Sequence, residues 1–123
     1  MKINNVVVIG SGTMGGGIAA QLCNANIPVT LLDLKTEISK KARDIIFNSR
    51  PPLLLDKSKI NNIKVGNISD DFGTVKKADW IVEAVVEKID IKRNLYKKIF
   101  NERKKESIVS SNTSSIPIKV LAQ

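Results

Sequence analysis

The feature that most constrains this chain is a short apolar run that leads directly into the glycine pattern G-x-G-x-x-G. The run is Val6–Ile9, and the glycines of the pattern are Gly10, Gly12 and Gly15. In a strand–turn–helix unit, the first glycine permits a tight turn and the second removes a Cβ that would block phosphates. The third lets the helix pack against the strand. Because the N-terminus of such a helix attracts anions, the stretch predicts a pyrophosphate-binding loop.

Apolar strands alternate with amphipathic helices along the rest of the chain. The predicted strands cover residues 6–9, 29–33, 63–67, 80–86 and 107–111, and the predicted helices cover 14–25, 36–48 and 89–100. Residues 53–62 read as a loop or a short helix. Short apolar strands of this kind are typical of a parallel sheet that is buried on both faces. The pattern predicts a single α/β domain over residues 1–123, with a Rossmann-type doubly wound parallel sheet in three α/β/α layers, strand order 3-2-1-4-5 and an incomplete C-terminal end.

Helical spacing of apolar residues predicts which helix faces are buried. In the second predicted helix these residues are Ile38, Ala42, Ile45 and Ile46, and in the third they are Ile91, Leu95, Tyr96, Ile99 and Phe100. The single cysteine, Cys23, is interpreted as a small buried hydrophobic residue of the first helix.

Composition and charge limit the classes of function that this chain can have. The net charge is +8, but the chain has only one Trp, one Tyr and three Phe. Because basic residues interleaved with aromatics are missing, nucleic-acid binding is not predicted, and the charge reflects a solvated surface or attraction to an acidic cofactor or substrate. No apolar run approaches the roughly 20 residues that cross a bilayer. With a lone cysteine and no signal-peptide pattern at the N-terminus, a cytoplasmic protein is expected.

A carboxylate follows the second predicted strand at a distance typical of dinucleotide-binding folds. Asp33 lies 18 residues after Gly15. An acid at this place accepts hydrogen bonds from the adenosine ribose and repels a 2′-phosphate, so the spacing favours NAD over NADP. The nearby Lys35 leaves NADP open, and Asp33 as a simple turn residue is the other interpretation.

Two further polar stretches follow predicted strands. Small residues such as Ala84 let a dinucleotide pass close to the backbone, and Glu87 and Lys92 come next. Glu87 is alternatively a helix-start carboxylate that compensates the dipole. Residues 112–115, Asn-Thr-Ser-Ser, place an amide and hydroxyls where a nicotinamide and a substrate oxygen would lie, and are alternatively an ordinary turn.

Four motifs in order resemble one known family. They are Gly10-Ser11-Gly12-Thr13-Met14-Gly15-Gly16-Gly17-Ile18-Ala19, Val29 to Asp33, Val82-Glu83-Ala84-Val85-Val86-Glu87, and Ser111-Asn112-Thr113-Ser114-Ser115. Together they resemble the NAD-binding domain of L-3-hydroxyacyl-CoA dehydrogenases. The Arg-Pro-Pro at residues 50–52 and the Asp-Trp-Ile-Val-Glu at residues 79–83 are similar to those of the large bacterial multidomain enzymes of fatty-acid β-oxidation.

The resemblance implies a reaction and roles for individual residues. The family transfers a hydride from C3 of a 3-hydroxyacyl-CoA to NAD while a base removes the hydroxyl proton. Ser114 matches the serine that positions the reacting oxygen of the substrate. The cofactor positions that the resemblance implies are Gly10, Gly12, Thr13, Met14, Gly15, Asp33, Ala84, Glu87, Lys92, Asn112 and Ser114. No metal site is predicted.

One departure from the family limits what these residues are expected to do. The family base is a histidine downstream of the Asn-Thr-Ser-Ser turn, and residues 1–123 contain no histidine. We therefore expect an N-terminal piece of such an enzyme, or a degenerate reading frame, that binds NAD without turnover. An acyl-CoA substrate, a missing helical C-terminal domain and a homodimer are further expectations. The alternatives are a 3-hydroxyisobutyrate-type dehydrogenase and a non-enzymatic NAD-binding module.

Overall fold

A computed structural model describes residues 3–49, 54, 57–84 and 89–111, and in this part of the chain five parallel strands form one sheet. Their order is β3-β2-β1-β4-β5, as predicted. The strands are β1 (Val6–Ile9), β2 (Val29–Asp33), β3 (Ile63–Asn67), β4 (Trp80–Glu83) and β5 (Ile108–Ser111). The α-helices are α1 (Thr13–Asn24), α2 (Thr36–Asn48) and α3 (Ile89–Glu102), and the 3₁₀ helices are η1 (Lys57–Asn62) and η2 (Phe72–Lys77).

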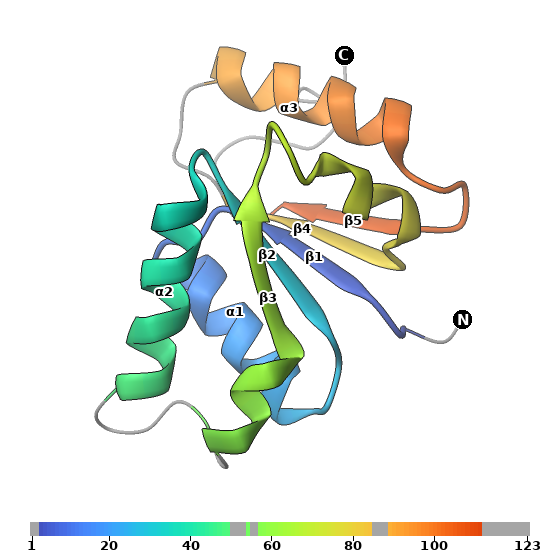
Figure 1. Cartoon of the computed structure of the whole chain (residues 1–123). Coiled ribbons are helices and arrows are strands. Elements are labelled where there is room, and N and C mark those ends of the chain that lie inside the picture. Colours follow the sequence, from blue (N-terminus) through green and yellow to red (C-terminus); the bar gives the residue numbers. More distant parts are fainter. Residues whose placement is uncertain (1–2, 50–53, 55–56, 85–88, 112–123) are drawn as a thin grey trace.

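Helices cover both faces of the sheet and give the predicted three layers. Figure 1 shows α1 and α2 on one face and α3 on the other. Because side chains alternate along a strand, each central strand supplies residues to both cores. The α1–α2 side is built around Val6, Val8, Leu31, Ile63 and Val82, and the α3–η2 side around Val7, Ile9, Leu32, Ile81 and Ile99.

The register of the central strands brings three strand ends to one edge of the sheet. Ile9 at the end of β1 is opposite Leu32 on β2 and Glu83 on β4. The ladder continues one residue further, because Gly10 N–H donates to the Leu32 carbonyl at 2.7 Å and Ala84 N–H donates to the Ile9 carbonyl at 2.7 Å. The segments that leave β1 and β4 therefore begin side by side.

Helix α2 is rotated relative to its predicted buried face. Ala42 and Ile46 are buried, as expected, but Ile38 and Ile45 are 43% and 58% exposed. The buried face includes Ser39, whose hydroxyl donates to the Gly66 carbonyl at 2.7 Å. Since this hydrogen bond satisfies the buried hydroxyl, the helix buries a serine where the apolar pattern favours isoleucines.

Helix α3 differs from its predicted face in one respect. Leu95, Tyr96 and Ile99 are buried, whereas Phe100 is 40% exposed and lies under the guanidinium of Arg103, 4.8 Å from its ring centroid. Ile91 has a side chain outside the described part of the chain. Because only a narrow stripe of α3 packs against the sheet, Phe100, at the edge of the predicted apolar face, is partly exposed to solvent.

Cys23 is buried, as predicted. Its thiol donates to the Lys59 carbonyl at 2.6 Å, and Lys59 Nζ donates to the Asn24 carbonyl at 3.0 Å. Burial raises the pKa of the thiol. These contacts fix η1, in the segment whose structure the sequence left open, against the end of α1.

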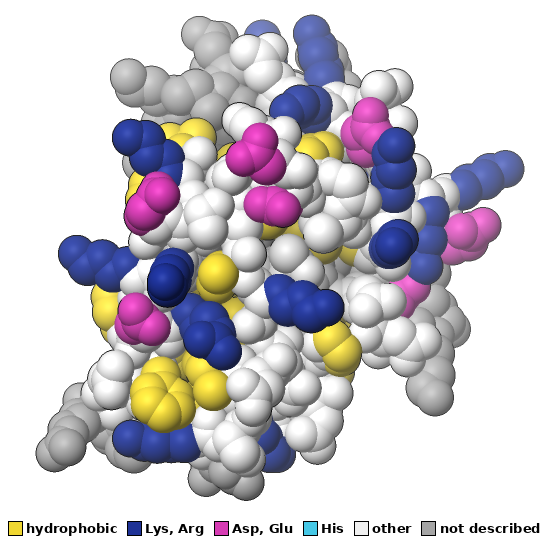
Figure 2. Space-filling model, in the orientation of Figure 1, with side chains coloured by type: hydrophobic (Ala, Val, Ile, Leu, Met, Phe, Trp, Pro, Cys, Tyr) yellow, Lys and Arg dark blue, Asp and Glu magenta, His cyan; other side chains and the backbone are white. Residues whose placement is uncertain are grey.

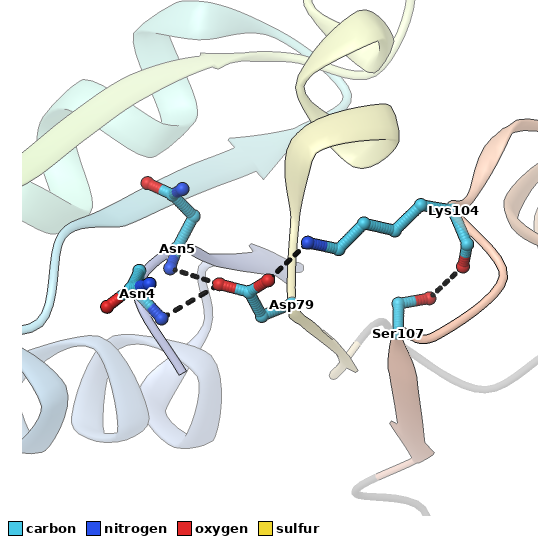
Figure 3. A network of polar contacts seen from close by, with 5 residues as sticks. All are labelled: Asn4, Asn5, Asp79, Lys104 and Ser107. Atoms are coloured by element: carbon cyan, nitrogen blue, oxygen red, sulfur yellow. Dashed lines mark hydrogen bonds and ion pairs between the residues drawn. The ribbon is translucent and has the colours of Figure 1, made fainter. Parts of the chain in front are cut away.

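At the amino end of the sheet, the carboxylate of Asp79 joins three segments of the chain (Figure 3). The backbone N–H groups of Asn4 and Asn5 donate to Asp79 Oδ2 at 2.8 and 3.0 Å, and Lys104 Nζ forms an ion pair with Oδ1. Ser107 Oγ in turn donates to the Lys104 carbonyl at 2.9 Å. The hydrogen bond from Lys104, together with the two amide hydrogen bonds, lowers the pKa of Asp79 to about 2.

Candidate functional site

A groove lies at the carboxyl edge of the sheet, where ligands bind in doubly wound folds. Its volume is about 380 Å³, and the glycine loop after β1 and the end of β2 form one side of it. Helix α3 forms the other side. The lining residues are Gly10, Ser11, Gly12, Asp33, Leu34, Ile68, Ala84, Asn94, Leu95 and Lys98.

Each glycine of the loop has a separate structural reason. Gly10 has φ 105°, in the region that favours glycine. A Cβ on Gly15 would lie 1.8 Å from the Gly10 carbonyl oxygen, so helix α1 could not pack this closely on the loop with a larger residue. A Cβ on Gly12 would meet nothing within 4 Å. The space beside the Gly12 α-carbon is therefore empty, and Gly12 lines the groove.

The N-terminus of α1 is left open toward an anion. Gly12 is the N-cap residue and provides no side-chain cap, and the first turn contains no acidic residue. Gly16 N–H donates to the Gly12 carbonyl at 2.8 Å, which is the first turn of the helix, and the N–H groups that precede it in an α-helix have no partner within the helix. Free N–H groups at the positive end of a helix dipole fit a pyrophosphate.

Asp33 is held at the groove by three hydrogen bonds. Ser11 donates to Asp33 Oδ2 twice, from its backbone N–H at 2.8 Å and from its hydroxyl at 2.6 Å. The Leu34 N–H donates to Oδ1 at 2.7 Å. The end of β2 is thereby tied to the glycine loop, and the carboxylate lines the groove as an acceptor for hydroxyl groups.

The remainder of the groove is more apolar and has one cation at its rim. Leu34 is 70% exposed and lines the groove together with Ile68. From the opposite wall, Lys98 extends to η2, where its Nζ lies 4.8 Å from the centroid of the Phe72 ring. A flat aromatic base would find apolar contacts between these walls.

The structure brings together several of the predicted site residues. Gly10, Gly12, Asp33 and Ala84 line one groove, with Gly15 directly behind the loop. Thr13 and Met14 begin helix α1 and Lys92 lies in α3, but their side chains fall outside the described part of the chain. Glu87, Asn112 and Ser114 also lie outside the described residues.

Part of the groove is formed by residues that the sequence did not predict. Ser11, Leu34, Ile68, Asn94 and Lys98 all line it. Two of them could have been found from the sequence. Ser11 is a variable position within the glycine pattern, and Leu34 directly follows Asp33. Asn94 and Lys98 are four residues apart on α3, so helical spacing places them on one face, but no motif indicated which wall that face would form.

A second hollow, of about 460 Å³, lies at the opposite, amino edge of the sheet. It is lined in part by Asn5, Thr30, Lys64 and Lys77. Although it is larger, it contains neither the glycine loop nor Asp33, so the smaller groove is the candidate site. On the face seen in Figure 2, Lys and Arg side chains are scattered among Asp and Glu rather than gathered in one patch.

Comparisons with known proteins show the family to which the chain belongs. The family model described as "3-hydroxyacyl-CoA dehydrogenase, NAD binding domain" matches residues 5–123. A probable 3-hydroxyacyl-CoA dehydrogenase from Deinococcus radiodurans is 42% identical, and the match covers 96% of this chain and 36% of that protein. A putative fatty acid oxidation complex trifunctional enzyme from Rickettsia felis is 39% identical, with 99% of this chain and 18% of that protein covered.

Solved structures show the same likeness. The 3-hydroxybutyryl-CoA dehydrogenase from Escherichia coli K12 matches with a TM-score of 0.85 and 29% identity, over 98% of this chain and 27% of that one. The dehydrogenase part of multifunctional enzyme 1 from Caenorhabditis elegans matches with a TM-score of 0.85 and 30% identity, over 98% and 29%. The chain thus spans well under half the length of these relatives.

The sheet order and the glycine loop are those of a dinucleotide-binding domain of the Rossmann class. Within that class, the chain belongs to the family of 3-hydroxyacyl-CoA dehydrogenase NAD-binding domains. Among the described residues, no helix is both long and apolar enough to span a membrane.

Proposed function

We propose that these residues form the cofactor-binding part of an enzyme that oxidises L-3-hydroxyacyl-CoA to 3-oxoacyl-CoA with NAD. The observation that carries the proposal is the groove, in which a glycine loop and Asp33 lie on one wall. Family membership supports the reaction, since the relatives named above are dehydrogenases of hydroxyacyl-CoA or fatty-acid oxidation enzymes. Cytoplasmic location and a homodimeric state are parts of the same proposal.

The groove residues bind the adenosine diphosphate half of NAD in this proposal. Gly10, Gly12 and the residues that open α1, Thr13 and Met14, surround the pyrophosphate. The carboxylate of Asp33 accepts from the adenosine ribose. Leu34 and Ile68, which both line the groove, contact the adenine, and this explains why an apolar side chain as exposed as Leu34 is placed beside a charged residue.

Residues that follow β4 and β5 would hold the nicotinamide half of the cofactor. Ala84 leaves space for the cofactor, Glu87 and Lys92 bind near the nicotinamide ribose, and Asn112 and Ser114 orient the nicotinamide and the substrate oxygen. When bound, NAD would supply the hydride acceptor for oxidation at C3 of the substrate. The proton acceptor is a histidine in the family pattern, and residues 1–123 contain none. We therefore propose that a further domain of the complete enzyme supplies it.

The cofactor assignment is tested by measuring binding of NAD and NADP to the protein by calorimetry. We expect NAD to bind more tightly than NADP, because a 2′-phosphate would face the Asp33 carboxylate. Asp33→Ala should weaken NAD binding by about tenfold or more, since a hydrogen bond to a charged group contributes about 1.5–3 kcal/mol. Asp44→Ala is the matched control, because Asp44 is an exposed carboxylate of α2 outside the groove. Equal losses in both variants, or unchanged NAD affinity in Asp33→Ala, would contradict the assignment.

The reaction is tested by following NADH oxidation with acetoacetyl-CoA. The product of the complete gene should reduce acetoacetyl-CoA, whereas residues 1–123 should bind NADH without turnover. Turnover by residues 1–123 alone would contradict the proposal that the proton acceptor lies elsewhere.

A further inference from the structure

We propose that Ser11 is a cofactor-binding residue that, together with Asp33, recognises the two hydroxyls of the adenosine ribose. Neither the glycine pattern nor the family resemblance assigns a role to this position. The inference rests on the proposed placement of the ribose at Asp33 and adds a second protein group to that contact.

The hydrogen bonds of Asp33 leave too few acceptor sites for both ribose hydroxyls. An ionised carboxylate offers about four lone-pair sites and no donor. Ser11 occupies two of them on Oδ2, through its N–H at 2.8 Å and its hydroxyl at 2.6 Å, and the Leu34 N–H occupies one on Oδ1. One site is left on Asp33, whereas the adenosine ribose of NAD presents two donors.

The Ser11 hydroxyl supplies the missing acceptor. Because the carboxylate can only accept, the hydroxyl must use its single proton toward Asp33, and its own oxygen keeps two lone pairs. The short 2.6 Å contact is typical of an O–H group bonded to a carboxylate. Ser11 is only 8% exposed, and the groove is the surface on which it opens. One ribose hydroxyl therefore donates to Asp33 and the other to Ser11.

This arrangement has a consequence for cofactor choice. A ribose diol provides two donors to the paired acceptors of Ser11 and Asp33. A 2′-phosphate provides only acceptors at the same place, and the Ser11 proton is already bonded to Asp33. Ser11 thus adds to the rejection of NADP by lowering the number of donors that a phosphate would find.

The test compares NAD with an NAD analogue that lacks both hydroxyls on the adenosine ribose. Ser11→Ala removes the hydroxyl and keeps the backbone N–H, so Asp33 keeps two of its three hydrogen bonds, those from the N–H groups of Ser11 and Leu34. We expect the Kd for NAD to rise about three- to tenfold, as for loss of one hydrogen bond between neutral groups, and the Kd for the dideoxy analogue to stay within twofold. In an Asp33→Asn background, the effect of Ser11→Ala on NAD should shrink, because the two groups act as a pair.

A buried serine outside the groove provides the control. Ser39 donates its hydroxyl to the Gly66 carbonyl, so Ser39→Ala should lower the melting temperature without distinguishing NAD from the analogue. Circular dichroism verifies that each variant is folded. An unchanged NAD affinity in Ser11→Ala, or equal weakening of NAD and the analogue, would overturn the role of Ser11. Absence of NAD binding by the unsubstituted protein would instead overturn the cofactor site, and this inference with it.

Discussion

Glycines of the first helix–loop unit differ in the space around their α-carbons. A Cβ on Gly15 would collide with backbone, at 1.8 Å from the Gly10 carbonyl oxygen, whereas a Cβ on Gly12 or Gly17 would meet nothing within 4 Å. Gly12 faces the groove, and Gly17 lies within α1 away from it. We therefore expect Gly15 to be needed for packing, Gly12 for cofactor binding, and Gly17 for neither.

Substitution of these glycines by alanine should give three different results. Gly15→Ala should destabilise the fold by about 2 kcal/mol or more, because overpacking against backbone forces the helix away from the strand. Gly12→Ala should leave stability nearly unchanged and weaken NAD binding by about tenfold, since its Cβ would occupy the space of the pyrophosphate. Gly17→Ala should stabilise the protein by about 0.5–1 kcal/mol, as alanine does in a helix interior. Urea unfolding and calorimetry measure these changes, and equal behaviour of Gly12→Ala and Gly17→Ala toward NAD would argue against the loop as the phosphate site.

At the scale of elements, helix α2 shows how a polar contact sets the rotation of a helix. Apolar spacing alone favoured burial of Ile38 and Ile45, and the structure leaves both exposed. Ser39 is fully buried because the Gly66 carbonyl on β3 accepts its hydroxyl proton. Since the partner lies 27 residues further along the chain, no local pattern could reveal it.

The rotation of α2 is tested by two neighbouring residues of the same type. Ile46→Ala should cost about 2–5 kcal/mol, the range for a truncated isoleucine in a packed core. Ile45→Ala should change stability by less than about 0.5 kcal/mol, because its side chain is already mostly in water. Chemical denaturation of both variants gives the comparison. Similar losses for the two would mean that the helix face is assigned wrongly.

At the scale of the whole molecule, Asp79 joins separate segments of the chain at the end of the sheet opposite the groove. Its carboxylate binds the backbone before β1 and the lysine that follows α3, so three distant segments depend on one charge. The electrostatic consequence is a pKa of about 2 in the folded protein, below the ordinary value of 3.8.

The lowered pKa of Asp79 predicts a defined pH dependence of stability. A folded-state pKa below the unfolded value means that the unfolded chain binds the proton first, so the carboxylate stabilises the fold above about pH 4 and this contribution is lost as pH falls toward 2. Asp79→Asn should lower the melting temperature at pH 7 and flatten its decrease between pH 4 and 2. Thermal melts across that interval test this, with Asp70→Asn, an exposed carboxylate, as the control. An unaltered slope in Asp79→Asn would show that other carboxylates dominate acid unfolding.

The order of the elements, the strand order and the proximity of Asp33 to the glycine loop could all be predicted from the sequence. These follow from local rules, namely strand and helix periodicity, glycine conformation and the fixed direction of parallel crossovers. The folded structure was needed to show that Ser11 donates to Asp33, 22 residues away, and that Asn94 and Lys98 line the opposite wall of the groove. It also decided which side of α2 is buried. Such contacts depend on side-chain geometry between distant segments, which no spacing within one segment encodes.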